Sequence, residues 1–154
     1  MTGSHLAQVN IARLAAPLDS SQLVDFVGNL EPINAIADAS DGFVWRLQTE
    51  DGDATSLRVF DDDWLIVNMS VWESIEALRN YVYRSPHAGV LRRRQEWFEK
   101  MVEAHVALWW IEAGTLPTLR DAEERLSTLR AEGPTPRVFT LKEPYPASRT
   151  APAP

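Results

Sequence analysis

The fold of this chain is decided by the run Val71-Trp72-Glu73-Ser74-Ile75-Glu76-Ala77-Leu78, followed by Tyr81-Val82-Tyr83-Arg84-Ser85-Pro86-His87. The residues leading into it alternate between an apolar row and a mixed row, which is the period of a β-strand: Leu65, Val67, Met69 and Val71 against Ile66, Asn68, Ser70 and Trp72. Ile75, Leu78 and Val82 then recur at the period of a helix. Pro86 cannot continue that helix, so we expect His87 at a corner where its imidazole can face a cavity.

The order of these residues resembles a known family. Trp-x-Ser-x-Glu-Ala-Leu, then an aromatic residue and Ser-Pro-His, is similar to the antibiotic-biosynthesis-monooxygenase group of the dimeric α+β barrel superfamily. The resemblance is closer to a family within that group called DUF3291, a domain of unknown function. It extends over about residues 5–146 and includes further segments: His5-Leu6-Ala7-Gln8, Gly42-Phe43-Val44-Trp45-Arg46-Leu47, Arg92-Arg93-Arg94-Gln95-Glu96-Trp97-Phe98, Leu108-Trp109-Trp110 and Gly133-Pro134-Thr135-Pro136.

The resemblance implies an α+β fold, with a ferredoxin-like antiparallel sheet that carries helices on one face. In the dimeric α+β barrel the other face is covered by the sheet of a second copy, so a homodimer is implied as well. We expect a single domain over residues 1–146 and a disordered Pro/Ala-rich tail over 147–154, whose removal should leave the fold and its stability unchanged. The superfamily includes oxygenases, haem enzymes, cyclases, isomerases and sensors, so the fold does not determine the function.

Composition excludes several classes of protein. The chain has 154 residues, no cysteine and a net charge of −7, which disfavours a nucleic-acid partner and rules out disulfides and thiolate sites. The run Arg92-Arg93-Arg94 is typical of a solvated helix face. The sequence shows neither a membrane-spanning stretch nor a signal peptide, so we expect a cytoplasmic protein without a membrane partner. Asp61-Asp62-Asp63 lacks the spacing of a calcium loop, and we expect no metal site.

Periodicity and turn residues predict the order of elements. Strands are expected at residues 6–14, 43–48, 64–72, 104–111 and 138–141, and helices at 21–39, 74–84, 87–101 and 118–131. Asp19 or Ser20 should cap the first helix and Thr118 the last, while Pro32 should kink or divide the first. Asp51-Gly52 indicates a hairpin turn between the second and third strands.

The mixed rows of the strands supply the candidate site. We assign them to a cavity on the sheet face away from the helices, which brings polar groups together in an apolar pocket: Gln8, Asn10, Arg46, Gln48, Asn68, Ser70 and Trp72. The alternative is that this row faces solvent. The apolar members Leu6, Ile66 and Trp72 would be exposed in a single chain, and we therefore expect the dimer interface to bury the mixed rows.

His87 is the candidate base, and Arg46 and Asn68 are candidate donors to a negatively charged oxygen. All three must face the cavity rather than the helices to act on one ligand. The alternative for His87 is a structural role, bonded to a backbone carbonyl. Tyr83, His105 and Trp109 are further candidates for ligand contact, since Tyr83 adjoins the helix break and His105 shares a row with Trp109.

The resemblance also makes haem a candidate ligand. In haem-degrading members of the superfamily an asparagine, a helical tryptophan and a histidine act together. Asn10 and His87 resemble two of these residues, but Tyr81 occupies the place of the tryptophan. No glycine-rich phosphate loop is visible, so we expect no bound organic cofactor.

Two functions of different classes remain open. The first is a cofactor-independent enzyme of secondary metabolism that acts on an apolar, aromatic or polyketide-like molecule. A base would generate an enolate, which then reacts with oxygen, as in a monooxygenase, or cyclises or isomerises. The second is a non-catalytic protein that binds a small molecule in the same cavity.

Overall fold

A computed structural model describes residues 3–49, 55 and 57–147. Its centre is an antiparallel sheet around the long strand β1 (Ser4–Leu14), which pairs with β3 (Leu65–Trp72) along one edge. The other edge of β1 pairs with β5 (Val106–Glu112) and, further along, with the short β4 (Phe98–Glu99). The strand β2 (Phe43–Arg46) lies outside β3. The order β2-β3-β1-β5 and the helical connections confirm the α+β class and the ferredoxin-like sheet.

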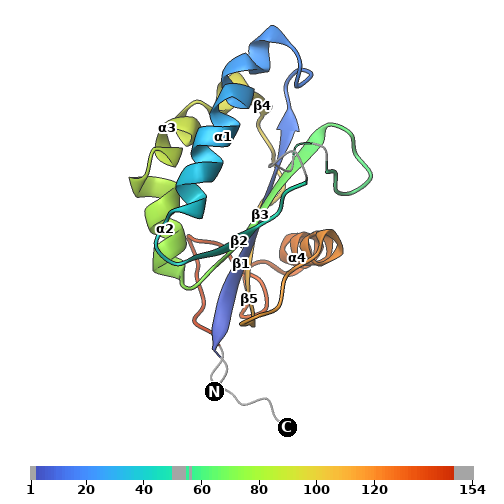
Figure 1. The fold of residues 1–154 in the computed structure, drawn as a ribbon. Helices are drawn as coiled ribbons and strands as arrows, with labels where there is room; N and C mark the ends of the chain where they lie inside the picture. Colours follow the sequence, from blue (N-terminus) through green and yellow to red (C-terminus); the bar gives the residue numbers. More distant parts are fainter. Residues whose placement is uncertain (1–2, 50–54, 56, 148–154) are drawn as a thin grey trace.

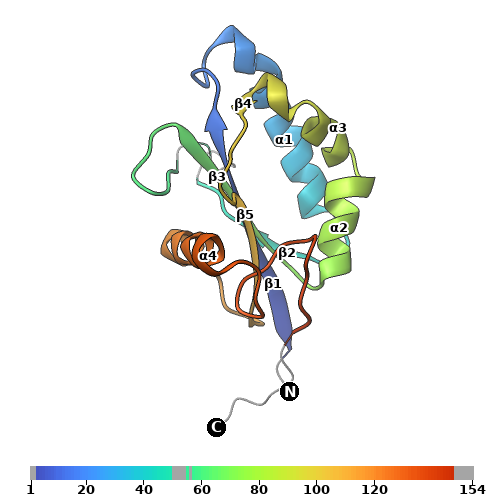
Figure 2. The same ribbon diagram turned by 180° about the vertical axis from the view of Figure 1, so that it is seen from behind.

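The helices lie on both faces of this sheet. Figures 1 and 2 show α1 (Val24–Asp38), α2 (Ile75–Arg84) and α3 (His87–Arg92) together on one side, and α4 (Leu119–Glu132) alone on the opposite side. The expectation that all helices lie on one face is therefore wrong for the last helix. The face opposite α1–α3, where a dimeric barrel would place a partner's sheet, is covered by α4 of the same chain. Within the described part of the chain, no helix combines the length and apolarity needed to cross a membrane.

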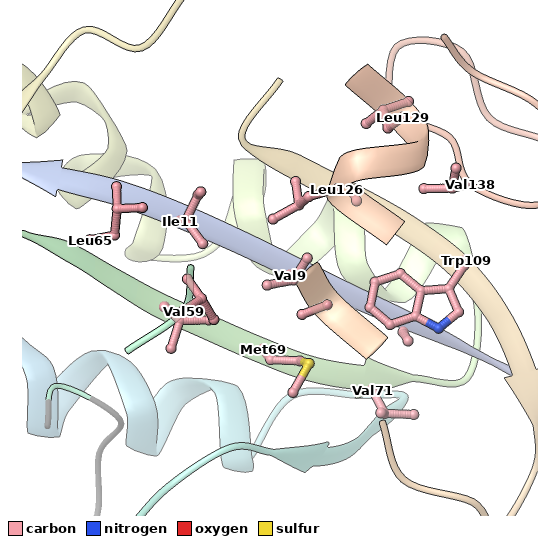
Figure 3. Close-up of a cluster of buried hydrophobic side chains, with 14 residues drawn as sticks. Val9, Ile11, Val59, Leu65, Met69, Val71, Trp109, Leu126, Leu129 and Val138 are labelled. Carbon is pink, nitrogen blue, oxygen red and sulfur yellow. The ribbon is translucent and has the colours of Figure 1, made fainter. Parts of the chain in front are cut away.

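The apolar rows of β1, β3 and β5 form the larger core with α4. Figure 3 shows Val9, Met69 and Trp109 meeting Leu126 and Leu129 of the helix. Each of these five side chains is at most 4% exposed, and burial of a large apolar side chain stabilises a fold by roughly 1.5–3 kcal/mol. A capping box starts α4, because Thr118 Oγ1 accepts from the Asp121 N–H and the Asp121 carboxylate accepts from the Thr118 N–H. The predicted cap is confirmed.

The mixed rows face α1, α2 and α3. Leu6, Trp72 and Leu108 are buried against Ala37 of α1 and Leu78 of α2, in a second apolar cluster. Leu6 and Trp72 are fully buried and Ile66 is only 8% exposed, so these residues form no surface for a partner. The expectation that a dimer interface buries the mixed rows is wrong, because helices of the same chain already do so. A homodimer stays a prediction and has to use another surface.

The first helix, α1, differs from the prediction at its start and at Pro32. Residues Ser21–Leu23 form a 3₁₀ turn before α1, and the Ser20 side chain makes no cap hydrogen bond. Pro32 neither ends nor divides α1. It removes only the hydrogen bond to the Gly28 carbonyl, and since both residues are exposed, water can bond to that carbonyl instead.

The predicted helix over 87–101 is much shorter than expected. After α3 the chain makes a 3₁₀ turn (Arg94–Glu96) and then forms β4. Burial of Trp97 against Leu14, Leu23 and Ile66 draws the segment back to β1, where the Ala15 N–H donates to the Trp97 carbonyl at 2.9 Å. Tertiary packing overrides the helical period here.

The predicted last strand is reduced to two isolated bridges, one between Phe139 and Leu108 and one between Val138 and Thr135. The Asp51-Gly52 turn and residues 148–154 of the predicted tail lie outside the described residues.

Candidate active site

A cavity of about 920 Å³ lies between the mixed face of the sheet and the helices α1–α3. The sheet contributes Asn10 and Asn68, the helices contribute Ile33, Tyr81 and His87, and all of these belong to one chain. Of the seven predicted residues of the mixed rows, Asn10, Arg46 and Asn68 line this cavity. The predicted side was wrong, because the cavity lies under the chain's own helices and not under a partner's sheet.

Two amides lie side by side on the sheet wall of the cavity. Asn10 of β1 and Asn68 of β3 are directly opposite in the register, so their side chains are neighbours on the same face. Behind them the buried Gln8 Nε2 donates to Asn68 Oδ1 at 2.8 Å and to Ser70 Oγ at 2.9 Å. Because its oxygen is occupied, Asn68 presents Nδ2 as a hydrogen-bond donor to the cavity. The Trp72 indole N–H also donates to Ser70 Oγ, at 2.8 Å.

The break between α2 and α3 determines the state of His87. In a continuous helix the Val82 carbonyl would accept from the N–H of residue 86, but Pro86 has none. His87 Nδ1 lies 3.3 Å from this carbonyl oxygen and bonds to it. Since a carbonyl can only accept, Nδ1 carries the proton, and Nε2 keeps its lone pair. Burial lowers the pKa of His87, and the bond to Val82 opposes this shift only in part. The imidazole is therefore a neutral base.

Tyr81 connects His87 to the sheet. Its ring stacks on Trp72 at 5.1 Å between centroids and lies 4.9 Å from the imidazole of His87. Burial is the main cause that raises the pKa of Tyr81, so the phenol stays protonated. Tyr81 was not among the predicted ligand contacts. Its position three residues after Leu78, on the buried face of α2, is the signal that places it beside the mixed row.

Arg46 reaches the cavity from β2 because of a bulge. The pairing of β2 with β3 shifts between Phe43 and Trp45, which leaves Val44 unpaired and sets Arg46 opposite Ser70. The strict alternation predicted for this strand is therefore wrong at Phe43 and Val44, although Arg46 lies on the predicted face. Its Nε bonds to Asp38 at the end of α1 at 2.8 Å, so a carboxylate balances its charge.

The remaining predicted residues separate into three groups. Tyr83 and His105 line the cavity, as expected, with Tyr83 57% exposed at its rim. Gln8, Ser70 and Trp72 are not among the lining residues and lie behind them, where they hydrogen-bond to one another through Ser70.

Gln48 and Trp109 lie away from the cavity. Gln48 is exposed beyond the end of β2 and does not line the cavity. Trp109 points to the α4 side of the sheet (Figure 3), and its ring lies under the Arg125 guanidinium at 5.7 Å. Alternation along β5 allows either face, and the large core under α4 takes Trp109 while Trp110 joins the α1–α3 side.

Comparison with known families matches residues 5–153 to DUF3291, a domain of unknown function. The chain belongs to the DUF3291 family. No curated protein matches it. This DUF3291 chain is similar to solved structures of PA3566 from Pseudomonas aeruginosa (13% identity, TM-score 0.48, 75% of this chain and 99% of that one) and Rv0793 from Mycobacterium tuberculosis (17%, 0.44, 74% and 97%). A monooxygenase from the gene ActVA-Orf6 of Streptomyces coelicolor, in complex with nanaomycin D, is also similar (17% identity, TM-score 0.42, covering 75% of this chain and 93% of that one). At these low scores, the fold assignment rests on the strand order and connections of the DUF3291 chain itself.

The residues around His87 in this DUF3291 chain do not fit the haem-degrading set. That set needs a helical tryptophan, and the structure has Tyr81 there, stacked on Trp72 and against the imidazole. The cavity instead offers one neutral base, two amides and a guanidinium. These are the groups needed to remove a proton and stabilise the resulting anion.

Proposed function

We propose that the chain is an enzyme that removes a proton next to the carbonyl of an apolar, aromatic or polyketide-like compound. The observation that carries the proposal is the bond between His87 Nδ1 and the Val82 carbonyl, which leaves the basic Nε2 unprotonated at the cavity wall. In the proposed step, the substrate C–H bond breaks and the proton goes to Nε2. The electron pair moves to the carbonyl oxygen, and an enolate forms without any cofactor.

The charge that develops on the oxygen needs donors. Asn68 Nδ2 is oriented for this role because Gln8 holds its oxygen. Arg46 supports it more weakly than a free guanidinium would, since Asp38 balances its charge. Preorganised donors of this type typically contribute about 10²–10³-fold to a rate. An enolate is the common first intermediate of reaction with oxygen, cyclisation and isomerisation.

Proton exchange tests this step without the natural substrate. The probe is 2-tetralone, whose CH₂ between ring and carbonyl is acidic, and ¹H NMR in deuterated buffer follows the loss of its signal. We expect the wild-type chain to accelerate exchange, and both His87→Gln and His87→Ala to abolish the acceleration. Asn68→Ala should reduce it, while Asn80→Ala, an exposed asparagine of α2, serves as the matched control.

Unchanged exchange in both His87 variants would remove His87 from catalysis. Saturable binding of the probe with no acceleration in the wild type would favour the non-catalytic binding protein. A visible spectrum of the purified protein tests the absence of a cofactor, and a Soret band would contradict it. We also propose a cytoplasmic location, because a chain without cysteine suits a reducing compartment.

A further inference from the structure

One end of the cavity is positively charged. Arg94, from the 3₁₀ turn after α3, and Lys100, just after β4, both line it. Glu99 is the acidic residue among the described lining residues, and Arg46 at the other end is balanced by Asp38. The cavity therefore has an excess of positive charge in a chain whose net charge is −7.

Two carboxylates close to Arg94 in the sequence or in the fold of this segment are bound by Arg93 instead. Arg93 pairs with Asp25 at 2.7 Å and with Glu96 at 2.8 Å. Arg94 donates one Nη1 bond to the Leu91 carbonyl, at 2.8 Å, and forms no ion pair with any described residue. Lys100 likewise has no carboxylate partner within residues 3–49, 55 and 57–147. Both cations remain available to a ligand.

The cavity around the positive end is lined mainly by apolar residues. Because β4 runs antiparallel to β1 and Glu99 pairs with Arg13, the next residue, Lys100, lies beside the stretch of β1 between Asn10 and Arg13, within roughly 10 Å of Asn10 along the strand. The lining in this part of the chain includes the amides Asn29, Asn34 and Gln95, but most of its residues are apolar and come from α1, α3, β3 and β4: Leu30, Ile33, Val90, Leu91, Ile66 and Phe98. A ligand that fills this space has an apolar body with a polar group at each end.

We propose that the ligand is an amphipathic carboxylate, with its apolar body between α1 and α3 and its carboxylate held by Arg94 and Lys100. The guanidinium of Arg94 can bind both carboxylate oxygens, and Lys100 adds a second charge. The inference rests on the proposed function for the reacting end of the molecule, which lies at His87. Recognition of the carboxylate itself does not require His87.

Two fluorescent probes that differ only in charge test the proposal. They are anthracene-2-carboxylate and anthracene-2-carboxamide, titrated against the full chain. We expect the wild type to bind the carboxylate about tenfold more tightly, as one or two charge-assisted hydrogen bonds would give. The preference should weaken with added salt and disappear in the double variant R94Q/K100Q. The control R92Q changes an exposed arginine of α3 outside the lining and should retain the preference.

A wild type with equal affinity for the two probes, or a double variant that keeps the preference, would overturn the proposal. Circular dichroism checks that the double variant is folded. If the double variant does not fold, the single variants R94Q and K100Q are used instead, and each should lose part of the preference. His87→Gln separates this inference from the proposed function. A wild type that shows no preference between the probes would overturn only the proposed binding of a carboxylate. Unchanged proton exchange in His87→Gln would overturn only the proposed role of His87 as the base.

Discussion

Replacing Pro86 with alanine should release His87 from its tautomer. Alanine restores an N–H at the position four residues after Val82, where it can donate to the carbonyl that His87 Nδ1 now occupies at 3.3 Å. The bias of Ser85 towards an extended backbone also disappears, so α2 can continue towards α3. One hydrogen bond contributes about 1 kcal/mol, so the ratio of Nδ1–H to Nε2–H tautomers should fall about fivefold. Proton exchange of 2-tetralone should fall in proportion to the fraction of the Nδ1–H tautomer, and therefore by less than the ratio does.

The assay is ¹⁵N NMR of the chain labelled in its histidine rings. The chain has three histidines, and the spectrum of His87→Gln identifies the signals of His87 by their absence. The wild type should show His87 protonated at Nδ1, and Pro86→Ala should show a mixture. Pro136→Ala makes the same change at an exposed turn and should leave the His87 signals unaltered. An Nδ1–H tautomer that persists in Pro86→Ala would refute the role assigned to the proline.

Three further predictions concern pH, support of the site and assembly. Because folding lowers the pKa of His87, the unfolded chain binds a proton at a higher pH than the folded chain does. The urea midpoint of unfolding should therefore fall as the pH drops below 6.5. An equally steep fall of the midpoint with pH in His87→Gln would contradict this. Gln8→Leu should lower the rate of proton exchange about fivefold and the free energy of unfolding by about 1–2 kcal/mol, because the hydrogen bonds to Asn68 and Ser70 are lost. Gln22→Leu, at an exposed position, should change neither quantity. An unaltered exchange rate in Gln8→Leu would show that Asn68 needs no support. Sedimentation equilibrium should show a homodimer formed through a surface other than the sheet faces, and a mass near 17.3 kDa at micromolar concentration would exclude it.

Local patterns in the sequence predicted much of the site, and long-range packing decided the rest. Asn10 and Asn68 follow from simple alternation, because β1 and β3 pair without a bulge. The cap of α4 is equally local, since Thr118 Oγ1 accepts from the Asp121 N–H at 3.1 Å. The face of the sheet that carries the cavity could not be predicted in this way. It depends on whether α4 or α1–α3 covers the mixed row, and no residue period specifies that choice.

Other differences have similar causes. The bulge at Val44 changes the register by one residue without a glycine or proline to mark it. Residues 93–101 have a helical period, but burial of Trp97 and pairing with β1 prevail over it. The helical period places Arg94 and Lys100 in a helix, whereas in the structure a 3₁₀ turn carries Arg94, and Lys100 follows β4.

Because α4 lies on the sheet face opposite α1–α3, the residues that stabilise the fold and the residues that select a ligand lie on different sides of the sheet. The large apolar core lies on the α4 side of the sheet, while the cavity lies on the other side, among α1, α2 and α3. Residues such as Ile33 and Val90 can therefore be exchanged to suit a different ligand without opening a void beside Leu126 or Trp109. A family built on this plan can diversify its chemistry on one side of the sheet while the other side preserves the fold. Laboratory evolution of this chain would best begin with the cavity walls of α1 and α3.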